Sequence, residues 1–395
     1  MGDAVIVSAV RTPIGRSGRS LAGLDLAGIG GAVVSEAIER SGLASSAVDD
    51  LVLGEALQGG GCTARYLAVA LGLPDDTPGL AVQRQCATGM AAVQWAAAQI
   101  RSGMARAVVA GGIESMTRAP LQFEKSPFPF GGVQPYLPPS HPDRPDAPNM
   151  NMLITVGENT ARECGITREE QDDWSYHSHL RAVEAIDEGR FADEIVPVHV
   201  PAGRNETTAV TTDELPRRDT TPDKLAKLPV LTGPGGTITA GNSSGIADGG
   251  AALVIVDRAL ADTLGLEVLA IVRSWASAGI DPSRTGLAPT VAVPRALELG
   301  GLAAPDVDLV EINEAFASMA VACSRQLGFP HDIVNVNGGA VGLGHPVGCS
   351  GARILVTLLH ELRRRGGGIG VGTLCAGGGM GSATVLEVPA AQSKS

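Results

Sequence analysis

Short apolar runs and longer helix-like segments alternate along the first part of the chain. The runs are continuous and rich in valine, isoleucine and leucine, which is typical of strands buried on both faces of a sheet. The expected strands are Ala4–Val10, Leu51–Leu57 and Ala107–Gly112, with one more at the start of Leu80–Gly89. The expected helices are Leu26–Ser41, which Gly42 ends, Ala64–Leu73, and Met90–Ser102, which Gly103 ends. This alternation predicts an α/β fold.

The C-terminal part repeats the same order of elements. The matched segments are Asp50–Leu57 with Asp308–Phe316, Leu80–Ser102 with Ile333–Arg365, and Ala105–Gly112 with Gly368–Gly379. The second pair reads in both copies as a strand, a glycine-bearing loop and a long helix, with a strand expected at Ile333–Val336. An internal duplication explains these matches most simply, and it predicts two similar α/β halves packed face to face.

The segment between the two copies, Arg118–Asn242, has a different composition. Pro127–Pro148 is dense in proline and is expected to be a long loop. Thr167–Glu188 is expected to be a helix that starts with a capping box formed by Thr167 and Glu170. Pro201–Lys227 is polar and is expected to be irregular, and core character returns as a strand at Ile246–Asp257.

These boundaries divide the chain into three parts. Residues 1–118 together with 246–270 are expected to form the first half, residues 119–245 an inserted loop domain, and residues 271–395 the second half.

Composition narrows the class of protein. The chain has 395 residues, of which 44% are hydrophobic but only 3% aromatic, so the core should consist of small and aliphatic side chains. A formal net charge of −12 argues against a nucleic-acid partner or an anionic membrane surface, and an anionic ligand would need a local basic patch. No apolar run reaches transmembrane length, and we expect a cytoplasmic protein. The six cysteines are scattered without a CxxC pair, which indicates neither a zinc site nor a disulfide framework.

The stretch Asn335–Arg353 holds six glycines between an apolar run and a helix-like run. Glycine is favoured where φ is positive or where the backbone approaches a ligand closely. Within this stretch His345 stands between Gly344 and Pro346, the position of a general base or of an oxyanion partner. The alternative is a glycine-rich turn with a histidine that only satisfies its own hydrogen bonds.

Two of the cysteines have contexts that suit chemistry. Cys86 is expected at the junction of a strand and a helix, where the helix dipole and free amides favour a thiolate nucleophile. Cys375 is expected at a strand end before Gly377–Gly379, where backbone N–H groups can face an oxyanion and a thiol can shuttle a proton. Both could instead be buried structural cysteines, as we interpret Cys62, Cys164, Cys323 and Cys349.

Asn313 begins the sequence Asn-Glu-Ala-Phe where another strand is expected to end. A carboxamide at this position can orient a water molecule or a substrate oxygen. The alternative role is that of a helix N-cap.

Taken together and in this order, the motifs closely resemble those of the thiolase family over nearly the whole chain. The matching stretches are VSAVRTPIGR, QRQCATGMAAV, AGGIESM, TITAGNSSGIADG, EINEAFA, NVNGGAVGLGHPVGCSGAR and TLCAGGGMG. The resemblance implies a fold of two duplicated βαβαβαββ halves in five αβαβα layers, with an inserted loop domain. Ketoacyl synthases share the fold, but they are expected to offer two histidines with one cysteine.

The resemblance also implies a role for each motif residue. Cys86 matches the nucleophile that carries the acyl group, and His345 matches the base that activates it and helps to form one oxyanion hole. Asn313 matches the residue that holds a water molecule in that hole. Cys375 matches the acid/base at the α-carbon of acetyl-CoA. The amides of Cys86 and Gly377 match the second oxyanion hole.

Coenzyme A is implied as a substrate, and no metal or redox cofactor is required. Arg217 matches a family arginine near the nucleotide end, although Arg217 and Arg218 could also be a solvated loop pair. Ser244 matches a residue near the pantetheine arm, with Ala240 beside it. The resemblance further implies a homodimer, or a homotetramer formed through the 119–150 loop.

Three departures from the family pattern limit the expectations on substrate. The nucleophile motif reads CATGM where many members have CGSGL, and the loop before His345 reads GGAVGLGHP rather than GGAIALGHP. Met152 stands where many short-chain members carry a histidine, so we expect an acyl pocket that accepts longer or bulkier chains.

The function expected from this pattern is that of an acyl-CoA acetyltransferase acting by a ping-pong mechanism through acyl-Cys86. It would cleave 3-ketoacyl-CoA with CoA or run the reverse condensation, with fatty acid degradation as one setting. Two alternatives remain at this stage: a condensing synthase that uses acyl-carrier protein, and a non-catalytic subunit of the same fold.

Overall fold

A computed structural model describes residues 2–136, 152–204 and 206–390. Its centre is a single mixed β-sheet in the order β12-β13-β14-β11-β1-β10-β5-β3-β4, with the short β2 pairing with β10. The first five strands in sequence are β1 (Ala4–Arg11), β2 (Gly15–Arg16), β3 (Asp50–Gly54), β4 (Gly79–Val82) and β5 (Ala107–Ser115). The others are β10 (Ala247–Asp257), β11 (Ala270–Gly279), β12 (Leu309–Ile312), β13 (Gly368–Ala376) and β14 (Met380–Val388).

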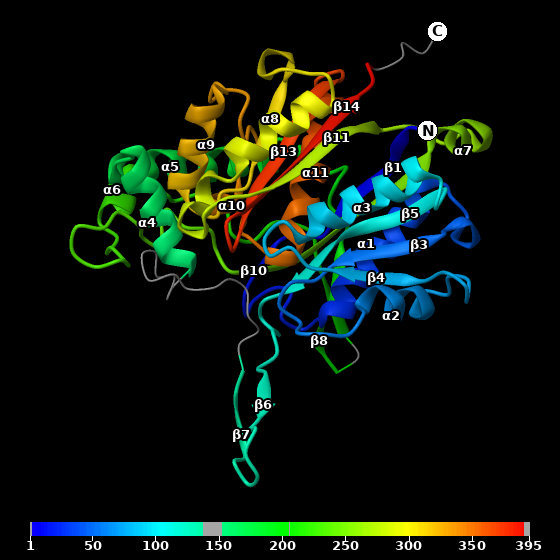
Figure 1. Ribbon diagram of the computed structural model, residues 1–395, viewed down its shortest axis with the longest axis horizontal. Helices are drawn as coiled ribbons and strands as arrows, with labels where there is room; N and C mark the ends of the chain where they lie inside the picture. Colours follow the sequence, from blue (N-terminus) through cyan, green and yellow to red (C-terminus); the bar gives the residue numbers. More distant parts are fainter. Residues whose placement is uncertain (1, 137–151, 205, 391–395) are drawn as a thin grey trace.

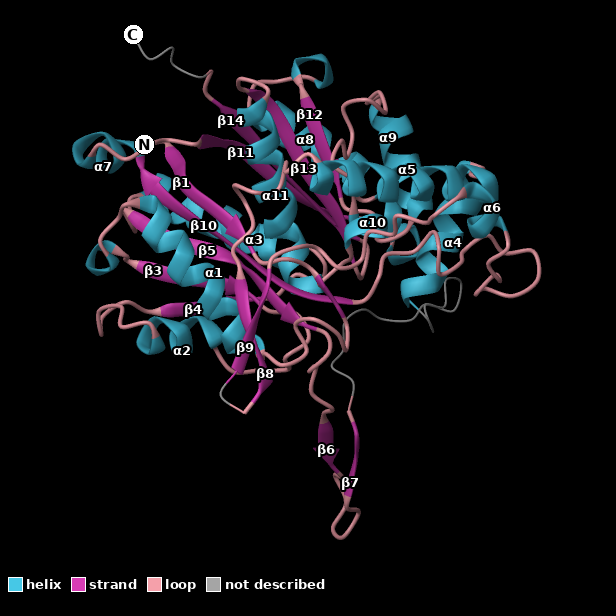
Figure 2. Cartoon of the chain, turned by 180° about the vertical axis from the view of Figure 1, so that it is seen from behind, coloured by secondary structure: helices cyan, strands magenta, loops and turns pink. Residues whose placement is uncertain are grey.

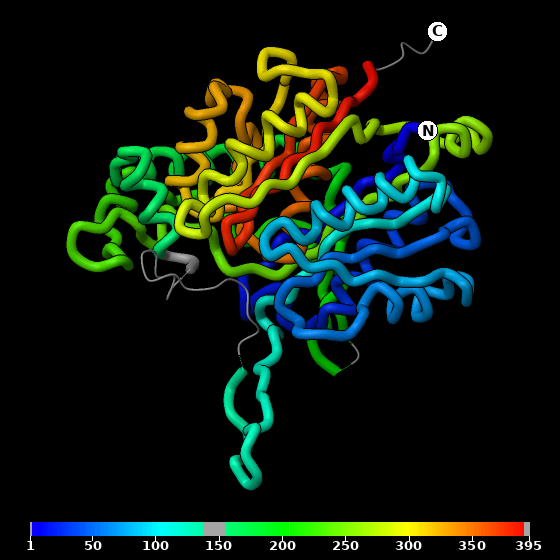
Figure 3. The backbone as a smooth tube through the Cα atoms, viewed as in Figure 1, coloured from blue at the N-terminus to red at the C-terminus, as the bar shows by residue number. Residues whose placement is uncertain are grey.

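The sheet has the same pattern on either side of its centre. Outward from β1, the strands β10 and β5 follow antiparallel, and then β3 and β4 follow parallel. Outward from β11, β14 and β13 follow antiparallel, and then β12 follows parallel. The two sides meet where Val5 and Ile6 pair with Ile271 and Ala270. The predicted duplication is therefore confirmed, and the blue-to-cyan and yellow-to-red parts of Figure 3 are its two copies.

One predicted strand is wrong. The segment 333–336 forms only a single parallel bridge, between Val334 and Val310, where the first copy has β4. Asn335 adopts a left-handed conformation with φ of 47°. Its side chain then accepts from Ile312 N at 2.8 Å and donates to Ile312 O at 2.9 Å, taking the place of a backbone ladder. A side-chain amide that satisfies these groups ends the strand after one residue.

Two long helices, α3 (Thr88–Ser102) and α11 (Val347–Arg364), pack against each other and contact strands of both halves. Their side chains form the largest buried cluster together with one face of the sheet. The helices cross closely, since a Cβ on Gly89 would lie 2.8 Å from the oxygen of Gly348. Glycine permits this approach. Helix α11 begins at Val347, within the glycine-rich stretch Asn335–Arg353.

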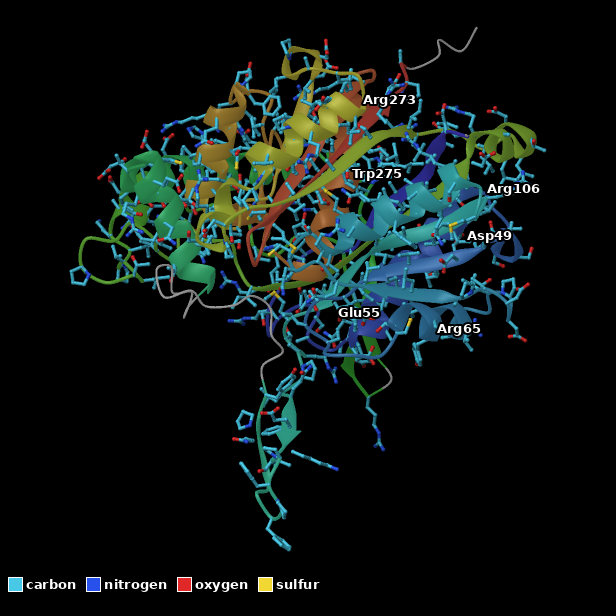
Figure 4. The ribbon with its side chains drawn as sticks, viewed as in Figure 1. Asp49, Glu55, Arg65, Arg106, Arg273 and Trp275 are labelled. Atoms are coloured by element: carbon cyan, nitrogen blue, oxygen red, sulfur yellow. The ribbon has the colours of Figure 1, made fainter. Side chains whose placement is uncertain are left out.

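The outer faces of the sheet are covered by separate groups of helices. The first half carries α1 (Leu26–Ser41), α2 (Thr63–Ala70) and α7 (Arg258–Leu264), and the second carries α8 (Pro289–Leu299) and α9 (Ala317–Leu327). With α3 and α11 inside, this gives the five expected layers (Figure 1). Helix α1 ends at Gly42 with φ of 69°, as predicted. At the start of β5, the Asp49 carboxylate accepts from the N–H of Arg106 at 2.6 Å (Figure 4).

The segment between the copies is more regular than its composition indicates. It contains helices α4 (Met152–Cys164), α5 (Arg168–Asp187) and α6 (Pro222–Ala226) and hairpins β6 (Phe123–Lys125)–β7 (Val133–Pro135) and β8 (Val198–Gly203)–β9 (Glu206–Val210). The capping box of Thr167 and Glu170 is confirmed. The expected irregularity of Pro201–Lys227 is wrong at β9, whose threonines and valine favour a strand, and at α6, which Thr221 caps.

The hairpin β6–β7 projects away from the body of the molecule (Figures 1 and 2). The strand β7 lies inside the expected loop Pro127–Pro148, and residues 137–148 of that loop lie outside the described residues. Among the described residues, no helix is both long and apolar enough to span a bilayer.

Candidate active site

Cys86 lies in the short connection between β4 and α3, immediately before the helix. Gln85 in front of it has φ of 51°, a left-handed conformation that costs energy for a residue with a side chain. The hydroxyl of Thr88 stabilises this turn, because it accepts from Arg84 N at 2.7 Å and donates to Gln85 O at 2.5 Å. The strained turn presents the thiol beside the first turn of α3.

The surroundings of Cys86 oppose the charge that the sequence led us to expect. Burial raises the pKa of the thiol to about 11, and the Glu114 carboxylate acts in the same direction. The N–H groups of Gly377 and of Cys86 itself hydrogen-bond the sulfur and oppose the rise. Desolvation thus outweighs the amides at the helix start, which favour the thiolate.

His345 is held in one orientation by the beginning of α11. Its amide donates to Gly245 O at 2.9 Å, and its Nδ1 lies 2.6 Å from the hydroxyl of Ser350. Because that hydroxyl donates to Pro346 O at 2.9 Å, Nδ1 carries the hydrogen and Nε2 keeps its lone pair. Burial, helped by Arg353, lowers the pKa of His345 to about 4. The ring is thus a neutral base.

Asn313 lies directly against this base. Its amide follows β12 and donates to Thr373 O at 3.0 Å, and its Nδ2 lies 3.4 Å from Nε2 of His345. Its Oδ1 is buried and has no hydrogen-bond partner among the described residues, so it can accept from a water molecule. The N-cap alternative is wrong, because α9 has Phe316 at its N-cap without a side-chain capping bond.

Glu314 connects Asn313 to the loop that carries His345. One carboxylate oxygen accepts from Trp174 Nε1 at 2.8 Å and from Asn335 Nδ2 at 2.7 Å. The other accepts from Ser178 Oγ at 2.7 Å and Val341 N at 3.0 Å. Sequence reasoning missed this role of Glu314 and that of Ser350, although both lie within motifs that it singled out.

Cys375 is the last residue but one of β13 and is almost completely buried. Burial raises the pKa of its thiol well above the ordinary value, and the proximity of Cys86 raises it further. In the turn that follows, Gly378 and Gly379 have φ of 86° and 77°. The N–H of Gly379 donates to Thr285 Oγ1 at 2.9 Å, and this turn presents the N–H of Gly377 to the sulfur of Cys86. The fold therefore brings Cys86, Cys375 and Gly377 together.

The residues expected to contact coenzyme A are less closely gathered. Ser244 joins the site through its amide, which donates to Ala315 O at 3.1 Å, and Ala240 is exposed at the start of the same loop. Arg217 is exposed, and its amide donates to His179 Nδ1 at 3.2 Å. Arg218 forms a surface ion pair with Asp187. Met152 is the first residue of α4, and its side chain lies outside what the structure describes.

The arrangement supplies a nucleophile, a neutral base, a second thiol and backbone donors. A thiol can form a covalent acyl intermediate once a base takes its proton. The N–H groups of Gly377 and Cys86 lie at the Cys86 sulfur, and the side chain of Asn313 lies against Nε2 of His345; backbone N–H groups in such a position can stabilise a developing oxyanion. Among the described residues, no group of three or more His, Cys, Asp or Glu is placed to hold a metal ion.

Comparison with known proteins gives matches over both halves. A family model described as the thiolase N-terminal domain matches residues 4–259, and one described as the thiolase C-terminal domain matches residues 266–388. The chain is 43% identical over 392 residues to an acetyl-CoA acetyltransferase of Escherichia coli, covering 98% of this chain and 99% of the relative. It is 40% identical over 408 residues to a 3-ketoacyl-CoA thiolase of Bacillus subtilis, covering 98% and 100%.

Solved structures agree with these matches. The acetyl-CoA acetyltransferase of Bacillus anthracis superposes with a TM-score of 0.91 at 40% identity, and the human mitochondrial 3-ketoacyl-CoA thiolase with 0.90 at 35%. Each comparison covers 98% of this chain and 99% of the other.

Proposed function

The chain belongs to the thiolase family and has the acyltransferase activity of that family, and we propose that it carries the acyl group as a thioester on Cys86. The observation that carries this proposal is the position of the Cys86 sulfur, which accepts a hydrogen bond from Gly377 N and lies near enough to Cys375 to raise the pKa of its thiol. A nucleophile beside both an amide donor and a second thiol suits a reaction with two proton transfers.

The first step forms the thioester. Nε2 of His345 takes the proton of Cys86, and the sulfur attacks the 3-keto carbon of a 3-ketoacyl-CoA. The N–H groups of Cys86 and Gly377 stabilise the negative charge that develops on the oxygen of the 3-keto group. When the bond between the α- and β-carbons breaks, the charge moves to the thioester oxygen of the departing acetyl-CoA. There the protonated Nε2 of His345 and a water molecule held by Asn313 stabilise it.

The second thiol completes the reaction. Cys375 gives its proton to the α-carbon, so acetyl-CoA leaves and Cys375 becomes a thiolate. A new CoA thiol passes its proton to Cys375 and attacks the acyl group on Cys86, releasing a shortened acyl-CoA. His345 then returns its proton to the sulfur of Cys86, and all protons balance. The high pKa of the Cys375 thiol supports this role, because the thiol must still hold its proton when the carbanion forms.

The proposed substrates are CoA and acyl-CoA thioesters. For the acyl chain, the buried apolar side chains of Val156, Ile238, Phe316 and Met319 cluster with Cys375, which supports apolar surroundings beside the reacting thiol. We retain the hypothesis that Met152, in place of a histidine, allows longer or bulkier chains. For the CoA arm we propose Ser244 and Ala240, with Arg217 at the phosphates. Within the described residues Arg217 forms no ion pair, whereas Arg218 pairs with Asp187.

Three further proposals concern the oligomeric state, the domain boundaries and the cellular location of the protein. We propose a homodimer or homotetramer, supported by the exposed apolar side chains on the projecting hairpin, which include Phe123, Phe128 and Val133. The division into 1–118 with 246–270, 119–245 and 271–395 is supported by the pairing of β10 with β1 and β5. We propose a cytoplasmic location.

Thiolysis of a series of 3-ketoacyl-CoAs of increasing chain length tests the proposed function, with Cys86→Ala as the inactive control. Turnover that rises with chain length supports the pocket proposed at Met152, and activity confined to acetoacetyl-CoA contradicts it. CoA-dependent cleavage that survives in Cys86→Ala contradicts the nucleophile. Activity with carrier-protein substrates in place of CoA favours the synthase alternative.

A further inference from the structure

The thiol of Cys375 has a sulfur partner that the mechanism above does not use. It donates to the thioether sulfur of Met319, with Sγ and Sδ 3.6 Å apart. Both side chains are almost completely buried, at 3% exposure for Met319 and 4% for Cys375. The other members of their cluster are Val156, Ile238, Phe316 and Ala315, none of which offers a side-chain acceptor.

The position of Met319 is fixed from both sides. It lies in the first turn of α9, where its amide donates to Phe316 O at 3.1 Å. Behind it, Gly286 leaves the space that the methionine fills, since a Cβ there would lie 2.7 Å from Met319 Cγ and 2.2 Å from Thr160 Oγ1. A methionine has three rotatable bonds and normally adapts to its surroundings, but these contacts leave little room for its sulfur to move.

The contact matters because a thiol can rotate its hydrogen. A thioether is a weak acceptor and cannot donate, so it interacts favourably with the Cys375 thiol and offers nothing to the thiolate. The bond therefore holds the resting Cys375 side chain in one orientation.

We propose that Met319 is a positioning residue for Cys375, holding its sulfur in place for proton transfer between Cys375 and the α-carbon of acetyl-CoA. This inference rests on the proposed function, in which Cys375 is the acid/base. In this role Met319 acts through the Cys375 sulfur.

Exchange of the acetyl-CoA methyl hydrogens with D₂O isolates this proton transfer. The thiolate of Cys375 removes a methyl proton, exchanges with solvent and returns deuterium to the carbon. Met319→Leu keeps the volume but removes the acceptor, and Met319→Gln restores an acceptor at similar length. We expect kcat for exchange to fall roughly tenfold in Met319→Leu, to recover to within about threefold of wild type in Met319→Gln, and KM to change little.

Two further measurements separate positioning from simple packing. The rate of Cys86 alkylation by iodoacetamide, followed on the Cys86 peptide, should stay near wild type in both variants, and so should the midpoint of thermal unfolding in Met319→Leu. Met104→Leu, at an exposed methionine, is the matched control for loss of a thioether. Exchange in Met319→Leu within twofold of wild type overturns the inference. So does a Gln variant no faster than Leu, or an equal loss of exchange and of Cys86 alkylation.

The variant Cys375→Ala distinguishes this inference from the function beneath it. If Cys375→Ala exchanges methyl hydrogens at the wild-type rate, the assignment of Cys375 fails and the role of Met319 fails with it. If Cys375→Ala abolishes exchange while both Met319 variants retain it, only the positioning role is overturned.

Discussion

The side-chain nitrogen Nδ2 of Asn313 lies 3.4 Å from Nε2 of His345. This contact joins the end of β12 to the loop before α11. The two residues are 32 positions apart, and each is fixed by its own neighbours: Asn313 through Thr373 and His345 through Ser350. With the hydrogen on Nδ1, Nε2 is the acceptor in this contact, and the buried Oδ1 of Asn313 has no hydrogen-bond partner among the described residues.

Replacement of Asn313 by alanine should reduce kcat for thiolysis. Loss of one preorganised oxyanion donor costs about 10²- to 10³-fold in turnover. KM should change by less than the turnover, because the donor stabilises charge that develops only during the reaction. Steady-state kinetics with acetoacetyl-CoA measure both constants. A variant whose only change is a higher KM would show that Asn313 binds substrate rather than stabilising charge.

The alkylation of Cys86 should depend steeply on pH. The pKa of the thiol is raised to about 11 and that of His345 is lowered to about 4, so at neutral pH the resting pair is uncharged. The thiolate is the species that reacts with iodoacetamide, so the rate should rise about tenfold per pH unit from pH 7 to pH 10. Labelling of the Cys86 peptide without substrate measures this. A rate that is already level at pH 6 would indicate a resting ion pair and contradict the neutral pair.

Glu314→Ala should destabilise the protein and slow catalysis together. The substitution leaves the four donors around the carboxylate without their acceptor, and unsatisfied buried groups cost about 1–3 kcal/mol each, although the costs do not add fully. Because Val341 and Asn335 belong to the loop that carries His345, that loop should lose its fixed position.

Chemical unfolding and kcat measure the two effects, with the exposed Glu298→Ala as the matched control. Unchanged stability and turnover in Glu314→Ala would contradict the role of Glu314 in fixing the loop that carries His345.

Two buried histidines should make stability depend on pH. Burial lowers the pKa of both His345 and His179 to about 4, below their ordinary value. Between the folded-state and unfolded-state pKa values, the unfolded chain binds more protons, so the free energy of unfolding falls as pH drops through this window. Urea titrations between pH 7 and pH 4.5 should show the decrease, and His179→Gln should reduce it. Equal stability across the window would contradict the neutral, buried state of both rings.

The sequence predicted the repeated elements and singled out side chains that the fold brings together, because both depend on local pattern. Gly344 and Pro346 marked His345, and the glycines after Cys375 marked the turn that presents Gly377. The strand expected at 333–336 failed because the side chain of Asn335 competes with the backbone ladder, which apolar periodicity does not reveal.

The supporting residues depend on packing between distant segments. Glu314 accepts from Trp174, 140 positions away, and Cys375 donates to Met319, 56 positions away. No spacing in the sequence brings these pairs together. The pKa of Cys86 could not be predicted for the same reason. The position before a helix favours a thiolate, but burial by the surrounding protein raises the pKa of the thiol.

The most direct test of the central claim is to trap the acyl group on the enzyme. The protein is mixed with acetyl-CoA, quenched in acid and digested, and each cysteine peptide is analysed by mass spectrometry. The account predicts one acetyl group on the Cys86 peptide, removed when CoA is added before quenching and missing in Cys86→Ala. An acetyl group on Cys375, or a fully active enzyme with no acetyl group on Cys86, would contradict it.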